Sequence, residues 1–374
     1  MSIESFSVRG RLADTGEGIT VDELQLAARN HAMPLEALRY DVTPAGLHYV
    51  LVHYDIPATN GSEWLLTVDG CVEQPLTFGL TELRAMGRRT ARVTLECAGN
   101  GRATLQPRPI SQPWLSEAVG TAEWTGVLLS DLLRLAGIRE DAVDVVFTGA
   151  DHGVERGVEQ DYQRGLSLAE AMNSGALVAW EMNGAPLPPQ HGYPLRLVVP
   201  GWYGMASVKW LRSIEVIGHE FTGYQNAVAY RIKTEPDEPG TAITRIQPRA
   251  LLVPPGFPDF MSRHRFVAAG TVPLFGRAWS GWAPIERVEV STDAGVTWHP
   301  AILDAPGNDT DNDEYAWRGF HYDWEATPGE HVLTVRAYDA AGNEQPIEAD
   351  WNRGGFANNT AQRLTVLVPE SAVS

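Results

Sequence analysis

The sequence has 374 residues, of which 44 % are hydrophobic and 20 % charged, a composition typical of a globular protein with two or three domains. Its formal net charge of −18 disfavours general binding to nucleic acid or an anionic membrane, because both require a basic face. Cys71 and Cys97 are too few for a disulfide framework. Residues 1–18 contain neither an apolar stretch nor a twin-arginine pair. We therefore expect a cytoplasmic protein without a membrane helix, or a periplasmic one if a signal was removed.

The first two thirds of the chain predict short helices mixed with strands. Residues 1–20 are polar and are expected to form a surface arm, followed by a short helix over residues 22–28. Ser130 is predicted to cap a helix over residues 131–136, which Gly137 ends. A further helix is predicted over residues 80–86. Strands are predicted at residues 64–72, 93–95, 143–147, 176–181, 195–199 and 207–216.

Composition changes near residues 232–258, where prolines and acidic residues are typical of a domain linker. Beyond it, alternating runs are separated by turns at residues 293–295 and 340–343. Several short strands over about a hundred residues predict a β-sandwich of the immunoglobulin type. The fold class is therefore expected to be α+β, with a mixed α/β domain followed by an all-β domain. The alternating runs cover residues 275–279, 285–291, 296–300, 315–322 and 331–338.

The most informative stretch is TLECAGNGR, residues 94–102. A β-branched and apolar lead-in predicts a strand ending in a turn, which places Cys97 where the strand becomes a loop. The glycines allow close approach of the backbone, and Arg102 supplies a permanent cation. This setting suits a metal ligand, a nucleophile or a redox centre, and a buried structural cysteine is the fourth possibility. Cys71, beside a predicted strand, is interpreted as structural.

Polar residues scattered through the first domain suggest a large anionic cofactor held from several loops. One group is the triplet at residues 29–31, whose three polar side chains cannot all be buried without partners. Zinc is disfavoured because no C-x-x-C or H-x-x-x-H spacing occurs, and a nucleotide because neither a P-loop nor GxGxxG follows a strand. The inference rests on Arg29, His31, Cys97, Arg102, Asp151, His191, Arg196 and Lys209.

Short motifs recur in a fixed order along both predicted domains. In the first domain they are RNH (29–31), CAGNGR (97–102), PW (113–114), TGAD (148–151), EMNG (181–184), HGYPLR (191–196) and SVKW (207–210). In the second they are GRAWSGW (276–282), RVEVSTDAGVTW (287–298), RAYDAAGNEQP (336–346) and WNRGG (351–355). With these motifs in this order, the chain closely resembles the sulfite oxidase family of molybdopterin enzymes over roughly residues 20–365. The resemblance implies an N-terminal arm at residues 1–20, a molybdopterin-binding oxidoreductase domain of mixed α/β type at 21–242 and an immunoglobulin-like dimerisation domain at 243–374.

The resemblance implies one Mo-molybdopterin per chain, with Cys97 as the thiolate ligand of molybdenum. A soft, deprotonated thiolate suits this metal. No haem is expected, because neither a CxxCH motif nor a haem domain is seen in the sequence. The family's cofactor-binding roles correspond to Arg29, Asn30, His31, Asp151, His191, Arg196, Ser207, Val208 and Lys209.

The resemblance also implies the reaction, which is oxidation of sulfite to sulfate by oxygen-atom transfer at an Mo-oxo centre. Electrons would pass to oxygen or to a separate acceptor such as a cytochrome. Tyr224 is the alternative to Tyr230 as the active-site tyrosine, because the family's motif reads GYQNAVAYRI here. The expected protein partner is a second copy of the chain, bound through the C-terminal domain. The family's substrate-pocket roles correspond to Arg29, Arg102, Trp114, Tyr230 and Arg363.

Three other functions compete with sulfite oxidation. Nitrate reductases share the domain pair, and some relatives act on other S- or N-oxides. A non-catalytic binding protein would carry neither molybdenum nor pterin. A hydrolase could use Cys97 as nucleophile and His191 as base, but no orienting acid is evident and the arginines would have no role.

Overall fold

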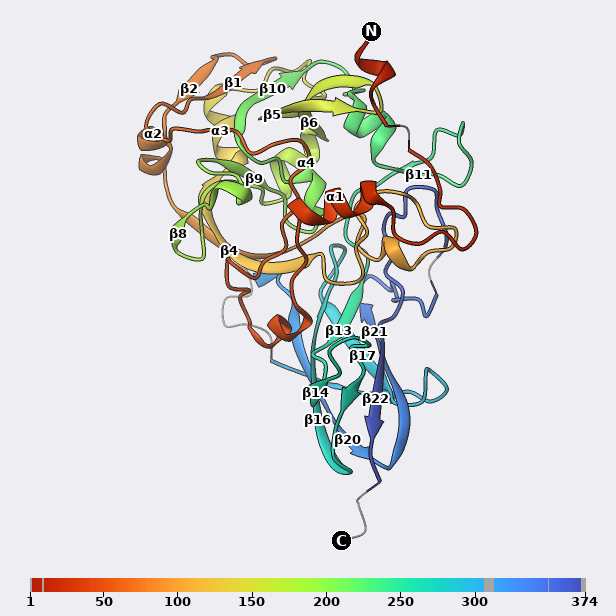
Figure 1. The fold of residues 1–374 in the computed structure, drawn as a ribbon. Helices are drawn as coiled ribbons and strands as arrows, with labels where there is room; N and C mark the ends of the chain where they lie inside the picture. The colour runs from red at the N-terminus through yellow and green to blue at the C-terminus, as the bar shows by residue number, and fades with distance from the viewer. Residues whose placement is uncertain (1, 9, 306–312, 349, 371–374) are drawn as a thin grey trace.

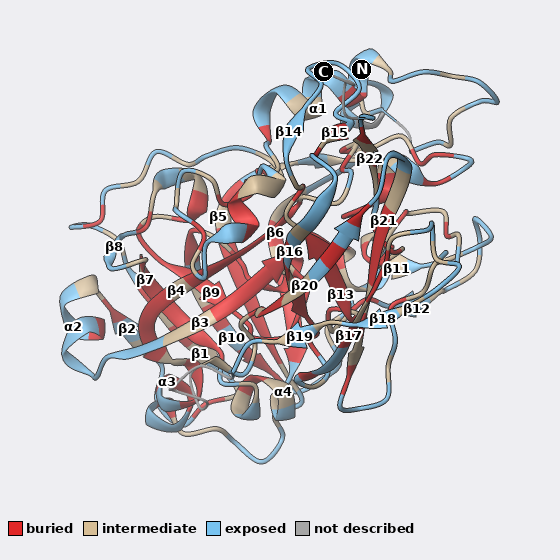
Figure 2. Cartoon of the chain, turned by 90° about the horizontal axis from the view of Figure 1, so that it is seen from below, coloured by how far each residue is buried: buried red, intermediate tan, exposed pale blue. Residues whose placement is uncertain are grey.

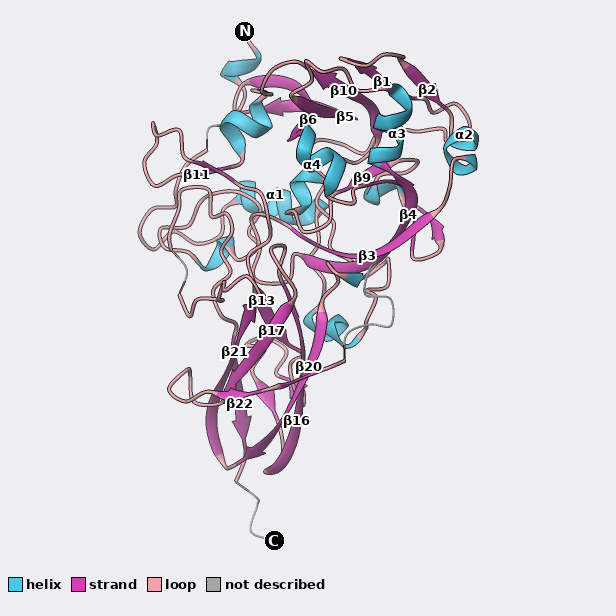
Figure 3. Cartoon of the chain, turned by 180° about the vertical axis from the view of Figure 1, so that it is seen from behind, coloured by secondary structure: helices cyan, strands magenta, loops and turns pink. Residues whose placement is uncertain are grey.

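The computed structural model describes residues 2–8, 10–305, 313–348 and 350–370. A larger part built from the first two thirds of the chain lies above a narrower β-sandwich, and the two termini lie at opposite ends of the molecule (Figure 1). The helices lie almost entirely in the larger part (Figure 3). No helix of the described residues is long and apolar enough to cross a membrane. The predicted arrangement, a mixed α/β part followed by an all-β part, is confirmed.

Two sheets form the frame of the larger part. The first has the strand order β2-β1-β10-β5-β6, in which only β1 and β10 run parallel. The second has the order β3-β4-β7-β8 and is antiparallel, with β9 also paired to β7. Their strands are β1 (Leu66–Gly70), β2 (Leu76–Phe78), β3 (Arg89–Glu96), β4 (Val119–Leu128), β5 (Asp144–Glu155), β6 (Val158–Ser167), β7 (Leu177–Met182), β8 (Ala185–Pro186), β9 (Arg196–Val198) and β10 (Leu211–Ile217).

Short helices cover these sheets. Thr20 and Glu23 form a reciprocal capping box that starts the first helix. Ser130 does not cap a helix as predicted, because the helix begins at Leu129, two residues earlier than expected, and Ser130 lies inside it; Gly137, at φ +70°, does end it. The helices are α1 (Val21–Arg29), α2 (Leu80–Ala85), α3 (Leu129–Ala136) and α4 (Leu168–Asn173).

The lower part is a sandwich of two sheets, with strand orders β13-β16-β20-β19 and β14-β15-β22-β21-β17-β18. Its core contains Leu274, Val288, Phe320, Trp324 and Val335, contributed by both sheets. A short β11–β12 hairpin precedes it. The strands are β11 (Arg231–Ile232), β12 (Thr241–Ala242), β13 (Arg249–Leu252), β14 (Phe257–Pro258), β15 (Arg265–Phe266), β16 (Gly270–Trp279), β17 (Ile285–Ser291), β18 (His299–Pro300), β19 (Ile302–Leu303), β20 (Arg318–Ala326), β21 (Gly329–Asp339) and β22 (Arg363–Val368).

Three predicted segments differ most from the structure. The segment 232–258 is not all linker, because its residues 249–252 form the fully buried strand β13. Residues 207–210 form a loop rather than the start of a strand, and Trp210 there takes a left-handed φ of +50°. The run 296–300 contributes only the two residues of β18. The domain boundary between residues 242 and 243 stays a prediction.

Buried side-chain contacts join the larger part to the β-sandwich. The indole of Trp279 on β16 donates to the carboxylate of Glu96 at 2.8 Å, and the guanidinium of Arg249 on β13 lies 3.1 Å from the same carboxylate. Trp279 also belongs to the main hydrophobic core of the larger part. Buried residues accordingly continue through the central strands of the larger part and into the sandwich (Figure 2). Because Glu96 precedes Cys97 directly, the second part helps to fix the cysteine loop.

Candidate active site

The loop after β3 places Cys97 and Arg102 side by side. The backbone amide of Cys97 donates to the carbonyl of Ala118 at 2.9 Å, which fixes the end of the strand. An added Cβ on Gly99 would lie 2.6 Å from the guanidinium of Arg102, so glycine is needed there for the arginine to fold back over the loop. Gly101 has a φ of +87° that turns the chain. The loop glycines therefore make room for the buried Arg102 guanidinium.

Two cavities meet at Cys97. The larger one, of about 450 Å³, opens on the side of Arg102, and we call it the substrate-side cavity. The smaller one, of about 70 Å³, extends toward β9 and the 207–210 loop, and we call it the cofactor-side cavity. Leu51, His53, Cys97 and Tyr230 line both cavities. A group bound to the Cys97 sulfur would thus be reached from both sides.

Five of the expected cofactor-binding residues line the cofactor-side cavity together. The Arg196 guanidinium donates to the carbonyls of His191 and Ser207 at 3.0 and 3.2 Å. The Lys209 ammonium donates to the carbonyls of Leu51 and Gln190 at 2.7 and 3.0 Å. These backbone contacts orient the two cations without neutralising their charges. The five residues are Asp151, His191, Arg196, Ser207 and Lys209.

Burial strongly shifts the pKa values of three of these groups. Desolvation lowers the pKa of His191 to about 2 and that of Lys209 to about 7, and it raises the pKa of Asp151 to about 6. The neighbouring charge of Arg196 also lowers the pKa of Lys209, whereas Asp151 opposes this shift. The site therefore holds charged and polar groups away from water without full compensation.

Unpartnered buried atoms show that these residues fit a polar cofactor. The Asp151 Oδ1, His191 Nε2 and His48 Nε2 atoms are buried and have no hydrogen-bond partner within the described structure. Such atoms are costly unless a ligand or water satisfies them, and a pterin edge and a phosphate would do so. The cavity is narrow, so its side chains would have to move apart to admit a pterin. The donor set nevertheless matches the chemistry of molybdopterin.

The substrate-side cavity contains the expected Arg102, Trp114 and Tyr230. Arg102 is buried; its Nε donates to the carbonyl of Gly354 at 2.7 Å, and its guanidinium lies 5.0 Å from the Phe356 ring centroid. Burial raises the pKa of the Cys97 thiol, and the Arg102 charge opposes this rise. A cation next to the sulfur thus favours the thiolate that binds metal.

Tyr230 follows the single π-helical segment of the described residues, Gln225–Ala229. Its ring lies 5.5 Å from the buried Arg164 guanidinium, and it lines both cavities, whereas Tyr224 lines neither. Burial raises the pKa of Tyr230 well above its ordinary value, so the hydroxyl is a donor at neutral pH. Of the two tyrosines considered, Tyr230 has the position required.

Some expected residues do not reach either cavity. Arg29 is exposed and donates to the Tyr54 carbonyl at 2.5 Å, and His31 is exposed beside it. Val208 is buried between two lining residues. Arg363 lies on β22 with a half-exposed side chain 3.5 Å from Glu348, facing a different cleft. The sequence resemblance implied that Arg363 belongs to the substrate pocket. The structure instead places Arg363 outside the substrate-side cavity.

Asn30 supports the candidate site by holding neighbouring segments in place through hydrogen bonds. Its buried amide donates to Gln112 Oε1 at 2.9 Å, and its Oδ1 accepts from the Val52 amide at 2.7 Å. It thereby ties the end of α1 to two segments that line the substrate-side cavity, in which Asn30, Val52 and Gln112 all take part. The RNH triplet thus acts on the site mainly through its middle residue.

The second part of the molecule contributes Arg353, Gly354 and Phe356 to the substrate-side cavity. The Ala357 amide donates to the Ala98 carbonyl at 2.8 Å, which holds this segment against the cysteine loop. Sequence reasoning included residues 351–355 in a shared motif but gave them no role. The motif could have singled out these residues, but it does not show that Arg353 lines the same cavity as Arg102, which lies more than 250 residues earlier in the sequence.

Sequence reasoning also missed a histidine–carboxylate pair. His53 Nε2 lies 2.9 Å from Glu155 Oε2, and Gln225 Nε2 donates to the same oxygen at 3.0 Å. His53 lines both cavities. Its partner comes from the far end of β5, about a hundred residues away, a separation that no local spacing pattern reveals.

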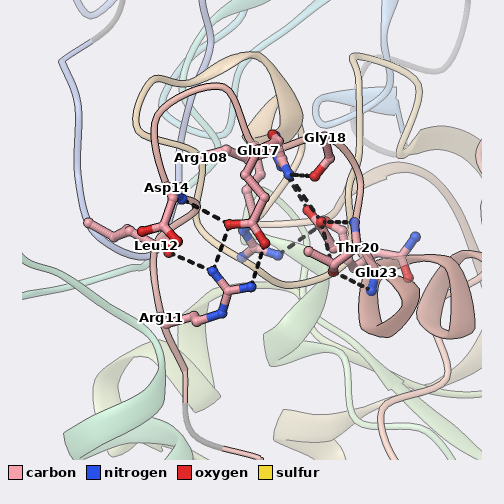
Figure 4. Close-up of polar contacts among 10 residues, drawn as sticks. Arg11, Leu12, Asp14, Glu17, Gly18, Thr20, Glu23 and Arg108 are labelled. Carbon is pink, nitrogen blue, oxygen red and sulfur yellow. Dashed lines mark hydrogen bonds and ion pairs between the residues drawn. The ribbon is translucent and has the colours of Figure 1, made fainter.

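The N-terminal arm borders the substrate-side cavity, to which Gly10, Arg11 and Leu12 contribute. Figure 4 shows how the arm is held: Arg11 pairs with Glu17 through two hydrogen bonds of 2.6 and 2.8 Å. Arg108 donates to the buried Glu23 at 2.8 Å and to the Gly18 carbonyl at 2.7 Å (Figure 4). These contacts hold the predicted N-terminal arm across the rim of the substrate-side cavity.

The geometry disfavours two alternatives. A cysteine hydrolase needs an imidazole that accepts a proton from the thiol, yet burial lowers the pKa of His191 to about 2 and raises that of Cys97. No group of three His, Cys, Asp or Glu side chains within the described ranges could hold a metal ion by itself. A metal at Cys97 would need ligands from outside the protein, as a dithiolene cofactor provides.

Comparison with known proteins defines the class. Residues 53–225 match the family described as oxidoreductase molybdopterin binding domain, and residues 244–368 match the Mo-co oxidoreductase dimerisation domain. The protein is therefore a molybdopterin-dependent oxidoreductase. Within that class it belongs to the sulfite oxidase family, and its cofactor is Mo-molybdopterin.

The relatives include enzymes with different substrates. The chain is 30 % identical to an NADH nitrate reductase of Phaseolus vulgaris and 31 % identical to one of Arabidopsis thaliana, over 88 and 90 % of this chain. It spans about two fifths of the length of these relatives, 40 and 39 %. The crystal structure of the sulfane dehydrogenase SoxCD from Paracoccus pantotrophus superposes with a TM-score of 0.78 at 25 % identity, covering 97 % of this chain and 91 % of that one.

Proposed function

We propose that the protein oxidises sulfite to sulfate. The observation that carries the proposal is the charge of the substrate-side cavity, which is lined by six arginine and lysine side chains and by a single carboxylate, Glu155. The whole chain has a net charge of −18, so this concentration of cations is local and selects an anionic substrate. Several cations favour a dianion over a monoanion, which supports sulfite over nitrate.

Arg102 and Arg353 are the cations proposed to hold the reacting anion. Arg102 is buried beside Cys97, where a charge-assisted hydrogen bond is strong because little water competes. Arg353 comes from the second part, next to Gly354, whose carbonyl accepts from Arg102. The two guanidiniums would fix the orientation of the anion, and Tyr230, which lines the same cavity, would donate a further hydrogen bond.

Molybdopterin, bound through Cys97, supplies oxygen-atom transfer and two-electron redox chemistry. The protein's part is to orient the cofactor from Arg196, Lys209, Asp151 and His191 and to neutralise the substrate. The released electrons are proposed to go to oxygen or to a separate acceptor such as a cytochrome. A homodimer formed through the C-terminal domain is proposed from the dimerisation-domain family that residues 244–368 match.

A direct test compares substrates on the purified, molybdenum-loaded enzyme. We expect sulfite turnover with ferricyanide, cytochrome c or oxygen as acceptor, and no nitrate reduction with a reduced viologen dye. Molybdenum content measured on the same sample guards against a negative result from missing cofactor. Nitrate reduction without sulfite oxidation by loaded enzyme would refute the proposal.

Nitrate reduction is the second candidate, and one finding favours it: curated nitrate reductases match this chain over about nine tenths of its length. Nitrate is also a small oxyanion, so Arg102 would serve it in the same way. Nitrate carries only one negative charge, whereas Arg102 and Arg353 together supply two positive charges, which suits the sulfite dianion better.

A further inference from the structure

The substrate-side cavity contains more cations than a small oxyanion can use. Four of its six arginine and lysine side chains either have protein partners or are assigned to the reacting anion. The other two, Arg156 and Lys233, have no side-chain hydrogen bond or ion pair within residues 2–8, 10–305, 313–348 and 350–370. Unpaired cations facing one cavity are available to a ligand.

Arg156 is positioned by its surroundings rather than free in solution. It occupies the turn between β5 and β6 with a left-handed φ of +49°, followed by Gly157 at +88°. The Gly157 amide donates to Ser7 Oγ at 2.8 Å, which joins the turn to the N-terminal arm. An added Cβ on Gly10 would lie 2.7 Å from the Arg156 guanidinium, so the guanidinium lies against the bare backbone of the arm. The arm thus holds Arg156 at the cavity rim.

Lys233 reaches the same cavity from another segment, just beyond β11. Its carbonyl accepts from the Arg353 amide at 2.8 Å, which fixes the backbone of Lys233 next to the segment that carries the second anion-binding arginine. Burial lowers the pKa of Arg102, and the charge of Arg156 adds to this shift. Arg156 therefore lies in the field of the proposed reaction site, and Lys233 lines the same cavity from another segment.

We propose that Arg156 and Lys233 form an outer anion subsite for the second anionic group of an extended substrate. The ligand class is an organosulfur compound with an oxidised sulfur group at one end, bound by Arg102, and a carboxylate or sulfonate at the other. Only the identity of the reacting group rests on the proposed function. A volume of about 450 Å³ is in the range of cavities that hold ligands far larger than a four-atom anion.

The test uses two unreactive probes and the purified holoenzyme. Methanesulfonate carries one anionic group and propane-1,3-disulfonate carries two. Isothermal titration calorimetry gives both dissociation constants, and competition against sulfite shows whether the probes occupy the same cavity. We expect the disulfonate to bind about tenfold more tightly, a typical gain for one additional charge-assisted contact. Equal affinities of the two probes would overturn the proposal.

Variants locate the second contact. Arg156→Gln and Lys233→Gln should each weaken disulfonate binding by about five- to tenfold and change methanesulfonate binding by less than about twofold. Gly10→Val should reproduce the effect of Arg156→Gln, because its side chain displaces the guanidinium without removing a charge. Arg139→Gln, which removes an exposed cation paired with Asp141, is the matched control and should leave both affinities unchanged. Equal weakening of both probes by either charge variant would exclude a separate subsite.

The outcomes separate the two proposals. If loaded enzyme fails to oxidise sulfite but still prefers the disulfonate, and Arg156→Gln removes that preference, the sulfite proposal fails and the outer subsite stands. If sulfite is oxidised and the two probes bind with equal affinity, the sulfite proposal stands and the outer subsite is refuted. Thermal melting of each variant, compared with the wild type, confirms that the folded protein was measured.

Discussion

The two cavities that meet at Cys97 both contain cations, but they differ in how strongly those cations are shielded from water. In the cofactor-side cavity, Arg196 is buried and Lys209 is half-buried, and desolvation lowers the pKa of Lys209 to about 7 and that of Arg196 to about 10. In the substrate-side cavity, Arg156 is exposed and Lys233 and Arg353 are half-buried; only Arg102 is buried.

This difference corresponds to two kinds of ligand. Buried cations with unsatisfied neighbours such as Asp151 and His191 gain most when a polar group occupies the cavity permanently, because the cost of their desolvation is then offset. Exposed cations lose little when a ligand leaves, since water replaces it. The first arrangement suits a cofactor that stays bound, and the second suits a substrate that must exchange. Variants on the two sides should therefore fail in different ways.

The largest effect is expected at the point shared by both cavities. Cys97→Ser replaces a soft thiolate with a hard hydroxyl that binds molybdenum poorly, and we expect sulfite turnover to fall by more than the roughly 100-fold typical of changes around a metal ligand. Circular dichroism should show an unchanged fold. Substantial activity in loaded Cys97→Ser enzyme would contradict the assignment of Cys97 as the metal ligand.

On the cofactor side, Lys209→Gln should lower molybdenum and pterin content about 10- to 100-fold, because the variant loses a cavity cation that we propose binds the cofactor's phosphate. Inductively coupled plasma mass spectrometry of the purified protein gives the metal content. Arg212→Gln, which removes an exposed cation from nearby β10, is the control and should retain the metal. Full retention by Lys209→Gln would argue against this side as the cofactor site.

On the substrate side, Arg102→Met should leave the metal content high but lower kcat/KM for sulfite about 100-fold, the order of magnitude for loss of a preorganised charge contact at a reacting anion. Steady-state kinetics normalised to molybdenum measures this. The expected pattern is the opposite of that for Lys209→Gln. Loss of metal in both variants would erase the distinction between the two cavities.

A matched pair tests which arginine of the second part acts. Arg353→Gln removes a cavity cation and should raise KM for sulfite about tenfold with kcat less affected. Arg363→Gln removes a half-exposed cation from β22 outside that cavity and should leave KM within about twofold of wild type. The reverse ranking would restore the position that the sequence resemblance suggested.

The smallest effect concerns stability and pH in the cofactor-free protein. His48 lines the cofactor-side cavity, and burial lowers its pKa from 6.5 to about 4. As pH falls between these values, the unfolded chain takes up a proton that the folded chain excludes. The free energy of unfolding should therefore fall with decreasing pH, by up to about 3 kcal/mol from this group. Above pH 6.5 the contribution is fully present.

Urea unfolding at pH 7.5 and pH 4.5 measures this dependence. His48→Gln should show a smaller difference between the two pH values, and His219→Gln, which changes an exposed histidine, should behave as the wild type. An identical pH dependence in His48→Gln and wild type would show that this histidine is not held neutral by burial.

Much of the fold could be predicted from local patterns. Period-two alternation identified the long sandwich strands β16, β17, β20 and β21, and the strand that delivers Cys97 ends where the glycines begin. The misplaced elements were those in which tertiary contacts override local preference. β13 is fully buried between the two parts although proline-rich sequence surrounds it, and Ser130 lies inside α3 because the helix starts at Leu129.

The site was predicted less completely than the fold. Asp151, His191, Arg196, Ser207 and Lys209 come together as the resemblance implied. Arg29, His31 and Arg363 do not reach the cavities, and Arg353, Arg156, Lys233 and the His53–Glu155 pair were not foreseen. A motif shows which residue types recur, but the direction of a side chain depends on packing between segments far apart in sequence.

By itself, the sequence determined the chemistry at the end of β3: a thiol, glycines that leave room, and a cation five residues later. These follow from short-range geometry, which the backbone imposes within a few residues. The tertiary structure decided what surrounds that loop. It buried one set of cations, left another accessible and brought residues 353–356 against Arg102, because such placement is set by long-range packing of the two parts.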